Sequence, residues 1–127
     1  DVVVCLAPQT PRTEKMISTR QFELMKARSV YVSVSRGIVT DSAALIARLE
    51  KGDIYVALDV FDPEPIPPES PILTLPNVFL RPHIGWFNGA PHPYFFKLIV
   101  DELERFAQGH ETFFDLTPRS LANRRGN

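Results

Sequence analysis

Four short runs of β-branched and apolar residues recur along the chain, and helix signals separate the first three of them. The runs read "DVVVCLA", "SVYVSVS", "IYVALDVF" and "NVFL". Runs of this length and composition predict buried β-strands. Strands that alternate with helices are joined by crossovers and lie parallel to one another. The sequence therefore predicts an α/β fold, a parallel sheet with helices on both faces.

Two short helices are predicted between the first three strands. The first runs from Thr19 to Lys26. The second lies in "TDSAALIARLEKGD", where Ala44, Leu45 and Leu49 form an apolar stripe and the Lys-Gly pair ends the helix. Side chains that can accept a hydrogen bond from the first turn mark both N-termini. These candidate N-caps are Ser18 or Thr19 for the first helix and Thr40 or Asp41 for the second.

A longer helix is predicted over residues 93–108. A proline suits its first turn, and Gly109 ends it. Its apolar stripe is wider than packing against one sheet face normally requires. We therefore expect part of the stripe to face another surface. The residues of the stripe are Phe95, Ile99, Leu103 and Phe106, with Tyr94 and Phe96 beside it.

Length and composition limit the possible functions. The chain has 127 residues, 44% hydrophobic and 23% charged, which suits one ordinary globular domain. A net charge of -1 gives no electrostatic footprint for nucleic acid or an anionic membrane. No apolar run approaches the roughly 18 residues that span a bilayer. The single cysteine, Cys5, indicates a reducing compartment, so we expect a cytoplasmic protein.

Reactive side chains follow three of the predicted strands. Arg36 comes after the second strand and His83 after the fourth. In the third, Asp59 follows "IYVAL" and Glu64 comes five residues later. Parallel sheets bind ligands at the carboxyl ends of their strands, so Arg36, Glu64 and His83 are expected to line one cleft. Taken singly, each of them is more often a surface charge, a turn residue or a structural histidine. The set favours a shared site.

The segment that carries Glu64 places a proline on each side of it. Pro63 has a fixed φ, and Pro65 biases the glutamate before it towards an extended backbone. Such a loop has little conformational entropy to lose when it holds a carboxylate in one position. The loop is therefore expected to present Glu64 to a partner.

Three longer stretches resemble the D-isomer-specific 2-hydroxyacid dehydrogenases: "LAPQTPRTEKMIS", "VSRGIVTDSAALIARLEKGDI" and "ALDVFDPEPIPPESPILTLPNVFLRPHIG". The resemblance runs in order from Asp1 to about Gln108. It implies a partial Rossmann-type, doubly wound parallel sheet with flanking helices, the C-terminal half of a nucleotide-binding domain. That half would occupy residues 1–91. Residues 92–109 would form a helix returning to a substrate-binding domain, and residues 110–127 a tail. The sequence has no G-x-G-x-x-G loop, so we expect a fragment of a longer enzyme.

The resemblance also implies catalytic roles. Arg36 would bind the substrate carboxylate, for which a planar guanidinium is well suited. His83 would be the general acid that protonates the carbonyl oxygen during reduction, and the base in the reverse direction. Glu64 would pair with the imidazole, favour its charged form and fix the ring.

The implied cofactor is NAD or NADP, and the implied substrate is a small 2-oxo or 2-hydroxy acid. Asp59 would accept from the nicotinamide carboxamide. The full-length protein is expected to be a homodimer without nucleic-acid or membrane partners, and no residues have metal-ligand spacing. The residues expected to contact the cofactor are Pro8, Thr13, Val34, Ser35, Arg36, Asp59, His83 and Gly85.

Two other functions are compatible with the same residues. One is an NAD-sensing regulator of the same fold, similar to corepressors, and the other is an inactive truncated piece. Trp86 departs from the family pattern, where a small residue is usual, and could cover the nicotinamide or narrow the pocket. His92 is interpreted as a residue at a helix start rather than a ligand.

Overall fold

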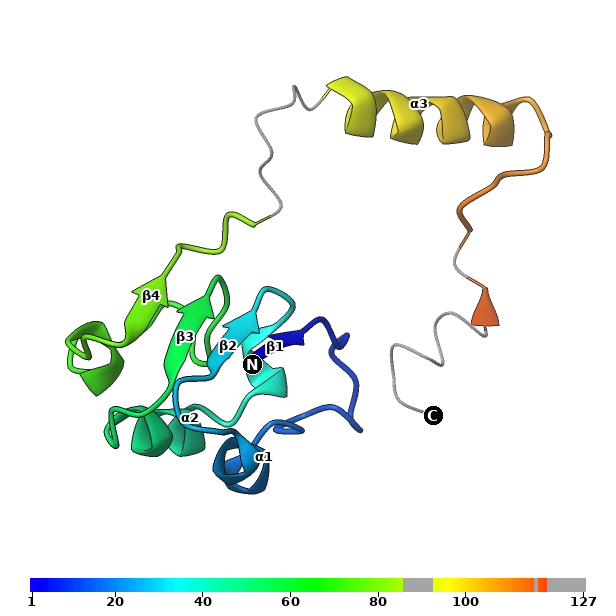
Figure 1. The fold of residues 1–127 in the computed structure, drawn as a ribbon. Coiled ribbons are helices and arrows are strands. Elements are labelled where there is room, and N and C mark those ends of the chain that lie inside the picture. The colour runs from blue at the N-terminus through cyan, green and yellow to red at the C-terminus, as the bar shows by residue number, and fades with distance from the viewer. Residues whose placement is uncertain (86–92, 116, 119–127) are drawn as a thin grey trace.

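The structure, a computed structural model, describes residues 1–85, 93–115 and 117–118. Its four strands form one parallel sheet in the order β1-β2-β3-β4 (Figure 1). In the register of the sheet Val4, Val32, Ala57 and Phe79 lie side by side, so the carboxyl ends of the strands meet at one edge. The predicted α/β class is confirmed. The strands are β1 (Val2–Cys5), β2 (Val30–Ser33), β3 (Tyr55–Leu58) and β4 (Val78–Leu80).

Side chains accept hydrogen bonds from backbone N–H groups at the N-termini of helices α1 (Thr19–Leu24) and α2 (Ser42–Leu49). The Gln21 side chain accepts from the Ser18 backbone N–H at 3.1 Å, and the Asp41 carboxylate accepts from the Ala44 N–H at 3.1 Å. These contacts satisfy backbone donors that have no partner within the helix. Helix α1 ends two residues earlier than predicted, because Met25 has an extended backbone with ψ of 131°.

The core lies between these two helices and one face of the sheet. Phe22 of α1 packs edge-on against the Tyr31 ring, with 5.4 Å between centroids. Leu45 and Leu49 of α2 are fully buried in the same cluster. In β2 the buried side chains are Tyr31 and Ser33. The valines of that strand therefore point to the opposite face.

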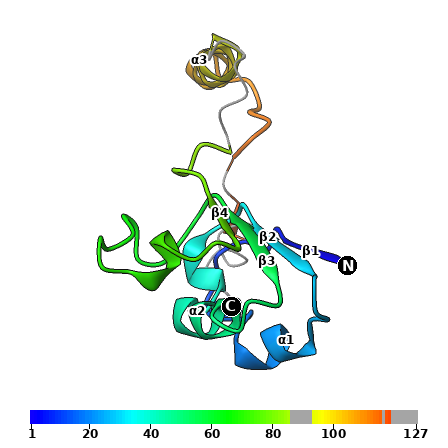
Figure 2. The same cartoon turned by 60° about the vertical axis from the view of Figure 1, so that its left-hand side comes forward.

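That opposite face carries apolar side chains that α1 and α2 do not cover. Val2 is 65% exposed, Tyr55 52% and Phe79 59%. Both helices lie on the other side of the sheet (Figure 2), so α1 and α2 cover one face and not both faces as the sequence predicts. We call this surface the open sheet face; its residues are Val2, Val4, Val30, Val32, Tyr55, Ala57 and Phe79.

Helix α3 (Pro93–Ala107) stands apart from the sheet in both views (Figures 1 and 2). It ends where Gly109, at φ 71°, donates its N–H to the Phe106 carbonyl at 3.0 Å. The chain then turns back along the helix, and the Glu102 carboxylate accepts from the Phe113 N–H at 2.8 Å. The Arg105 guanidinium lies 4.0 Å from the centre of the Phe113 ring. Among the described residues, no helix is long and apolar enough to cross a membrane.

Two short 3-10 turns complete the described elements. Gly37–Val39 follows β2, and Pro71–Leu73 lies in the connection between β3 and β4. Val39 and Ile72 are buried in these turns and join the core. The first turn places the segment after β2 against the segment after β3.

Candidate active site

The loops after β2 and β3 are in backbone contact at the carboxyl edge of the sheet. A Cβ added to Gly37 would lie 1.9 Å from the Phe61 carbonyl oxygen, so only glycine fits there. The Ser42 hydroxyl donates to the Asp62 carbonyl at 2.5 Å and holds the start of α2 to the same loop. These contacts fix the loop that carries Glu64 relative to the loop that carries Arg36.

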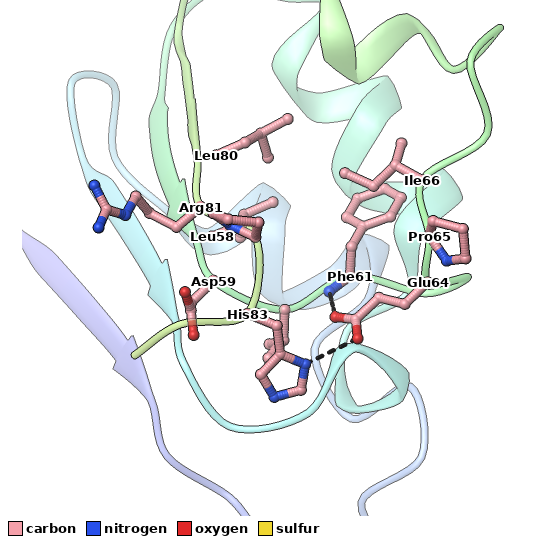
Figure 3. Close-up of a pocket in the computed structure, with 11 residues that line it drawn as sticks. Leu58, Asp59, Phe61, Glu64, Pro65, Ile66, Leu80, Arg81 and His83 are labelled. Atoms are coloured by element: carbon pink, nitrogen blue, oxygen red, sulfur yellow. Dashed lines mark hydrogen bonds and ion pairs between the residues drawn. The ribbon is translucent and has the colours of Figure 1, made fainter. Parts of the chain in front are cut away.

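Glu64 and His83 form a hydrogen-bonded pair. The Glu64 Oε2 atom lies 2.9 Å from Nδ1 of His83, and Oε1 accepts from the Phe61 N–H at 2.7 Å (Figure 3). Both oxygens of the carboxylate are thus engaged. The hydrogen bond that the sequence predicts between the two side chains is present. The peptide bonds before Pro63 and Pro65, on either side of Glu64, are both cis.

The surroundings of Glu64 favour its charged form. Burial by itself would raise the pKa of the carboxyl group, but the net effect is a lowered pKa. The lowering comes from the Phe61 N–H, from the His83 hydrogen bond and from attraction to a charged imidazole, and Asp59 opposes it slightly. The group can therefore act as the anionic partner of a histidine.

Asp59 is buried at the end of β3 and 7% exposed. Its Oδ1 accepts from the Ile84 N–H at 2.9 Å, and its Oδ2 accepts from the Gly85 N–H at 2.7 Å. The family resemblance implies a carboxamide acceptor here, and the sequence gives no sign of these backbone contacts. Each carboxylate oxygen has a second lone pair, so the group keeps capacity for another donor.

A cavity of about 310 Å³ lies beside the Glu64–His83 pair. Its walls are mainly apolar, and the side chains in Figure 3 converge on it from the ends of β3 and β4 and from the proline-rich loop. Arg81 also borders it, with its guanidinium directed away from the pair (Figure 3). The sequence patterns do not indicate the apolar walls of this cavity. These walls include Phe61 and Ile66, from the segment after β3, and Leu80, the last residue of β4.

Arg36 borders a neighbouring, more open cleft of about 780 Å³. Its guanidinium donates to the Ser35 carbonyl at 2.8 Å, so the side chain lies back along its own loop. Pro8 and Val34 line the same cleft. The sequence predicts that Arg36, Glu64 and His83 line one cleft. In the structure they border two adjacent hollows, Arg36 one of them and the Glu64–His83 pair the other.

The remaining residues predicted to contact a cofactor lie close by. Thr13 donates its hydroxyl to the Pro8 carbonyl at 2.6 Å and closes the loop after β1. Val34, Asp59 and Gly85 border a third hollow, on the open sheet face. Val34 also borders the Arg36 cleft, which makes the two hollows neighbours. Trp86 and His92 lie outside the described residues.

This geometry defines a class of protein: an α/β domain with a parallel sheet and an acid–imidazole pair at the carboxyl edge of that sheet. Residues 1–85 match the family model described as "D-isomer specific 2-hydroxyacid dehydrogenase, NAD binding domain". The chain belongs to this family.

Curated relatives with longer chains match most of this chain. Glyoxylate/hydroxypyruvate reductase B of Escherichia fergusonii is 44% identical over 111 residues, which are 87% of this chain and 34% of the relative. The Citrobacter koseri protein of the same name is 45% identical over 86 residues, 67% of this chain and 26% of the relative. The match thus spans between about a quarter and a third of the length of these relatives.

Solved structures share the fold. D-lactate dehydrogenase with NAD+ from Lactobacillus jensenii matches with a TM-score of 0.84 and 27% identity, over 92% of this chain and 39% of that one. An NADPH-dependent glyoxylate/hydroxypyruvate reductase from Sinorhizobium meliloti, in complex with NADP and sulfate, matches with a TM-score of 0.77 and 27% identity. That match covers 88% of this chain and 37% of the reductase.

Proposed function

We propose that this chain supplies the proton donor and the nicotinamide-facing surface of an NAD(P)H-dependent reductase of small 2-oxo acids. The observation that carries the proposal is the 2.9 Å contact between Glu64 and His83 at the carboxyl edge of a parallel sheet. A histidine held by a carboxylate can give a proton to a carbonyl oxygen and take it back in the reverse direction. The names of the curated relatives support glyoxylate and hydroxypyruvate as substrates.

Each polar residue of the site has a proposed task. His83 protonates the carbonyl oxygen of the substrate, and Glu64 holds the imidazole in place. Arg36 binds the substrate carboxylate, for which its side chain must turn from the Ser35 carbonyl towards the His83 side of the loop. A bound NAD(P)H would supply the hydride.

The hollow on the open sheet face fits the nicotinamide end of a dinucleotide. Val34 offers an apolar surface for a flat ring, and Gly85 leaves room beside it because it has no side chain. Asp59 has a lone pair for a carboxamide N–H. Pro8 and Ser35 border the adjoining cleft and would contact the neighbouring ribose.

The full-length protein is further proposed to be a cytoplasmic homodimer. A free, buried thiol at Cys5 suits a reducing compartment. The exposed apolar side chains of α3 support association with another protein surface.

The proposal is tested by the kinetics of the full-length enzyme that contains this chain, with glyoxylate or hydroxypyruvate as substrate. His83→Gln should lower kcat by roughly two to four orders of magnitude, the usual contribution of general acid–base catalysis. Arg36→Lys should raise KM for the 2-oxo acid as well, because lysine cannot form the bidentate contact. His110→Gln, at an exposed histidine beyond α3, is the control. Near-normal kinetics of the first two variants would exclude the assigned roles.

A further inference from the structure

The segment after β4 has an unusual backbone at the histidine of the pair. His83 has φ of 54°, in the left-handed region, although it is not a glycine. A residue with a Cβ is disfavoured in this conformation, and it persists only where the surroundings hold it. Something must therefore fix the chain at this point.

The Asp59 carboxylate is the group that holds this turn. The two N–H groups that follow His83, those of Ile84 and Gly85, both point at its oxygens, at 2.9 and 2.7 Å. Successive N–H groups next to a left-handed residue form a concave site for an anion. Asp59 fills it from a different strand, because it follows β3 whereas the turn follows β4.

The space around Gly85 is a second, independent sign that the Asp59 carboxylate lies very close to this turn. A Cβ added to it would lie 2.8 Å from Oδ2 of Asp59, closer than real Cβ atoms come to other atoms. The absence of a side chain at position 85 thus lets the carboxylate reach both N–H groups. The same turn directs the His83 ring to Glu64 (Figure 3).

We propose that Asp59 is a positioning residue for His83: its carboxylate clamps the Ile84 and Gly85 N–H groups and so keeps the imidazole on Glu64. The importance of this clamp for catalysis rests on the proposed function, but the clamp itself does not. Asp59 borders both the cavity of the Glu64–His83 pair and the hollow that fits a nicotinamide. A ligand that bonds to Asp59 in that hollow would therefore act on the placement of His83.

Hydrogen exchange and ring ¹⁵N chemical shifts of the labelled 127-residue chain test the clamp. In Asp59→Asn an amide N–H₂ replaces one acceptor, so exchange at Ile84 or Gly85 should quicken by roughly ten- to hundredfold, as for loss of a bond to a charged group. The His83 ring shifts should move towards those of Glu64→Gln, in which the charged partner of the imidazole is removed. Asp62→Asn, at the other aspartate of the same loop, should change neither signal.

Gly85→Ala and Asp59→Glu keep the clamp testable if Asp59→Asn does not fold. The added Cβ or methylene should displace the carboxylate and produce the same two changes. Exchange at buried β2 and β3 amides such as Tyr31 and Val56 reports that each variant is folded. Unchanged exchange at Ile84 and Gly85 and unchanged His83 shifts in any folded variant of this set would overturn the proposal.

Kinetics of the full-length enzyme separate this proposal from the proposed function. Positioning predicts that Asp59→Asn lowers kcat at least tenfold, whether or not KM for the dinucleotide also rises through loss of the carboxamide contact. A raised KM with normal kcat would instead make Asp59 a cofactor contact alone and contradict the clamp. If the exchange and shift changes occur but the full-length enzyme reduces no 2-oxo acid, the clamp stands and the proposed function fails.

Discussion

Glu64 shows how a short loop can keep a carboxylate charged although it is partly withdrawn from water. Its pKa is lowered from the model-peptide value of 4.5. A depressed pKa in the folded state means that the pair stabilises the fold fully above pH 4.5. That contribution is lost as the pH falls through the lower folded value.

The pH dependence of unfolding should reveal this contribution. The difference in unfolding free energy between the native chain and Glu64→Gln is expected to be constant between pH 5 and 6. It should shrink as the pH falls below 4.5, the ordinary pKa of a glutamate. Urea unfolding followed by circular dichroism at several pH values measures it. Glu69→Gln, at an exposed position of the same loop, should show no such trend. A difference that grows on acidification would contradict the assigned direction.

Tyr31 is a buried residue whose pKa is raised, whereas that of Glu64 is lowered. Burial raises its pKa to about 12, although the bond to the Thr40 hydroxyl acts to lower it. The neutral phenol is therefore favoured in the folded state, and stability should fall as the pH rises from about 10 to about 12. Its hydroxyl lies 2.7 Å from Oγ1 of Thr40.

Tyr31→Phe should lower the unfolding free energy at pH 7 by about 1 kcal/mol, because the Thr40 hydroxyl loses a buried partner. The variant should also lose less stability than the native chain between pH 9 and 11. Thermal unfolding across this range checks both expectations. Tyr55→Phe, at an exposed tyrosine of the open sheet face, is the matched control and should retain the alkaline loss.

At the scale of elements, the contact between the loops after β2 and β3 determines how the site is assembled. Gly37→Ala would force the Phe61 backbone to move, since the new Cβ would be 1.9 Å from its carbonyl oxygen. We expect a loss of about 1–3 kcal/mol, the usual cost of overpacking. Ser42→Ala removes only the hydroxyl bond to the Asp62 carbonyl and should cost about 1 kcal/mol.

Urea unfolding of both variants compares these costs, and the Glu64–His83 bond provides a local signal. Gly37→Ala should also change the His83 ring shifts, because Glu64 follows Phe61 on the displaced loop. If Gly37→Ala is as stable as the native chain, the close approach of the two loops is not a constraint on the fold.

The sequence predicted the elements well but not the face on which they pack. Strand and helix positions follow from β-branched runs, caps and glycine stops, which act locally. In "SVYVSVS" the valines suggest a core face, yet Tyr31 and Ser33 are buried and Val30 and Val32 belong to the open sheet face. Alternation identifies two faces of a strand, and only the crossovers decide which one the helices cover.

The candidate site was predictable to a similar extent. Strand ends indicated the position of Glu64 and His83, because parallel strands bring their carboxyl ends together. The clamp by Asp59 and the turn of Arg36 towards Ser35 were not predictable. They depend on backbone N–H and carbonyl directions, for which side-chain patterns contain no signal.

At the scale of the molecule, dinucleotide affinity should depend on residues outside this chain. The sequence has no G-x-G-x-x-G loop, and the pyrophosphate in such domains binds at the helix that follows one. The isolated 127-residue chain is therefore expected to bind NADH or NADPH weakly and to show no reductase activity. Isothermal titration calorimetry tests this expectation. A dissociation constant in the micromolar range would contradict it.

Two apolar surfaces of the molecule are exposed at once, the open sheet face and helix α3. Phe95 is 65% exposed, Phe96 62% and Phe106 75%. Exposed patches of this kind promote association.

The isolated chain should consequently self-associate and bind a hydrophobic dye. Phe96→Ser should reduce both, because the α3 patch loses one of its large side chains, while Glu104→Ser on the same helix should leave both unchanged. Multi-angle light scattering between 5 and 200 μM, with dye fluorescence on the same samples, measures the effect. A chain that stays monomeric and binds no dye would show that α3 packs against the open sheet face in solution, because each surface would then bury the other.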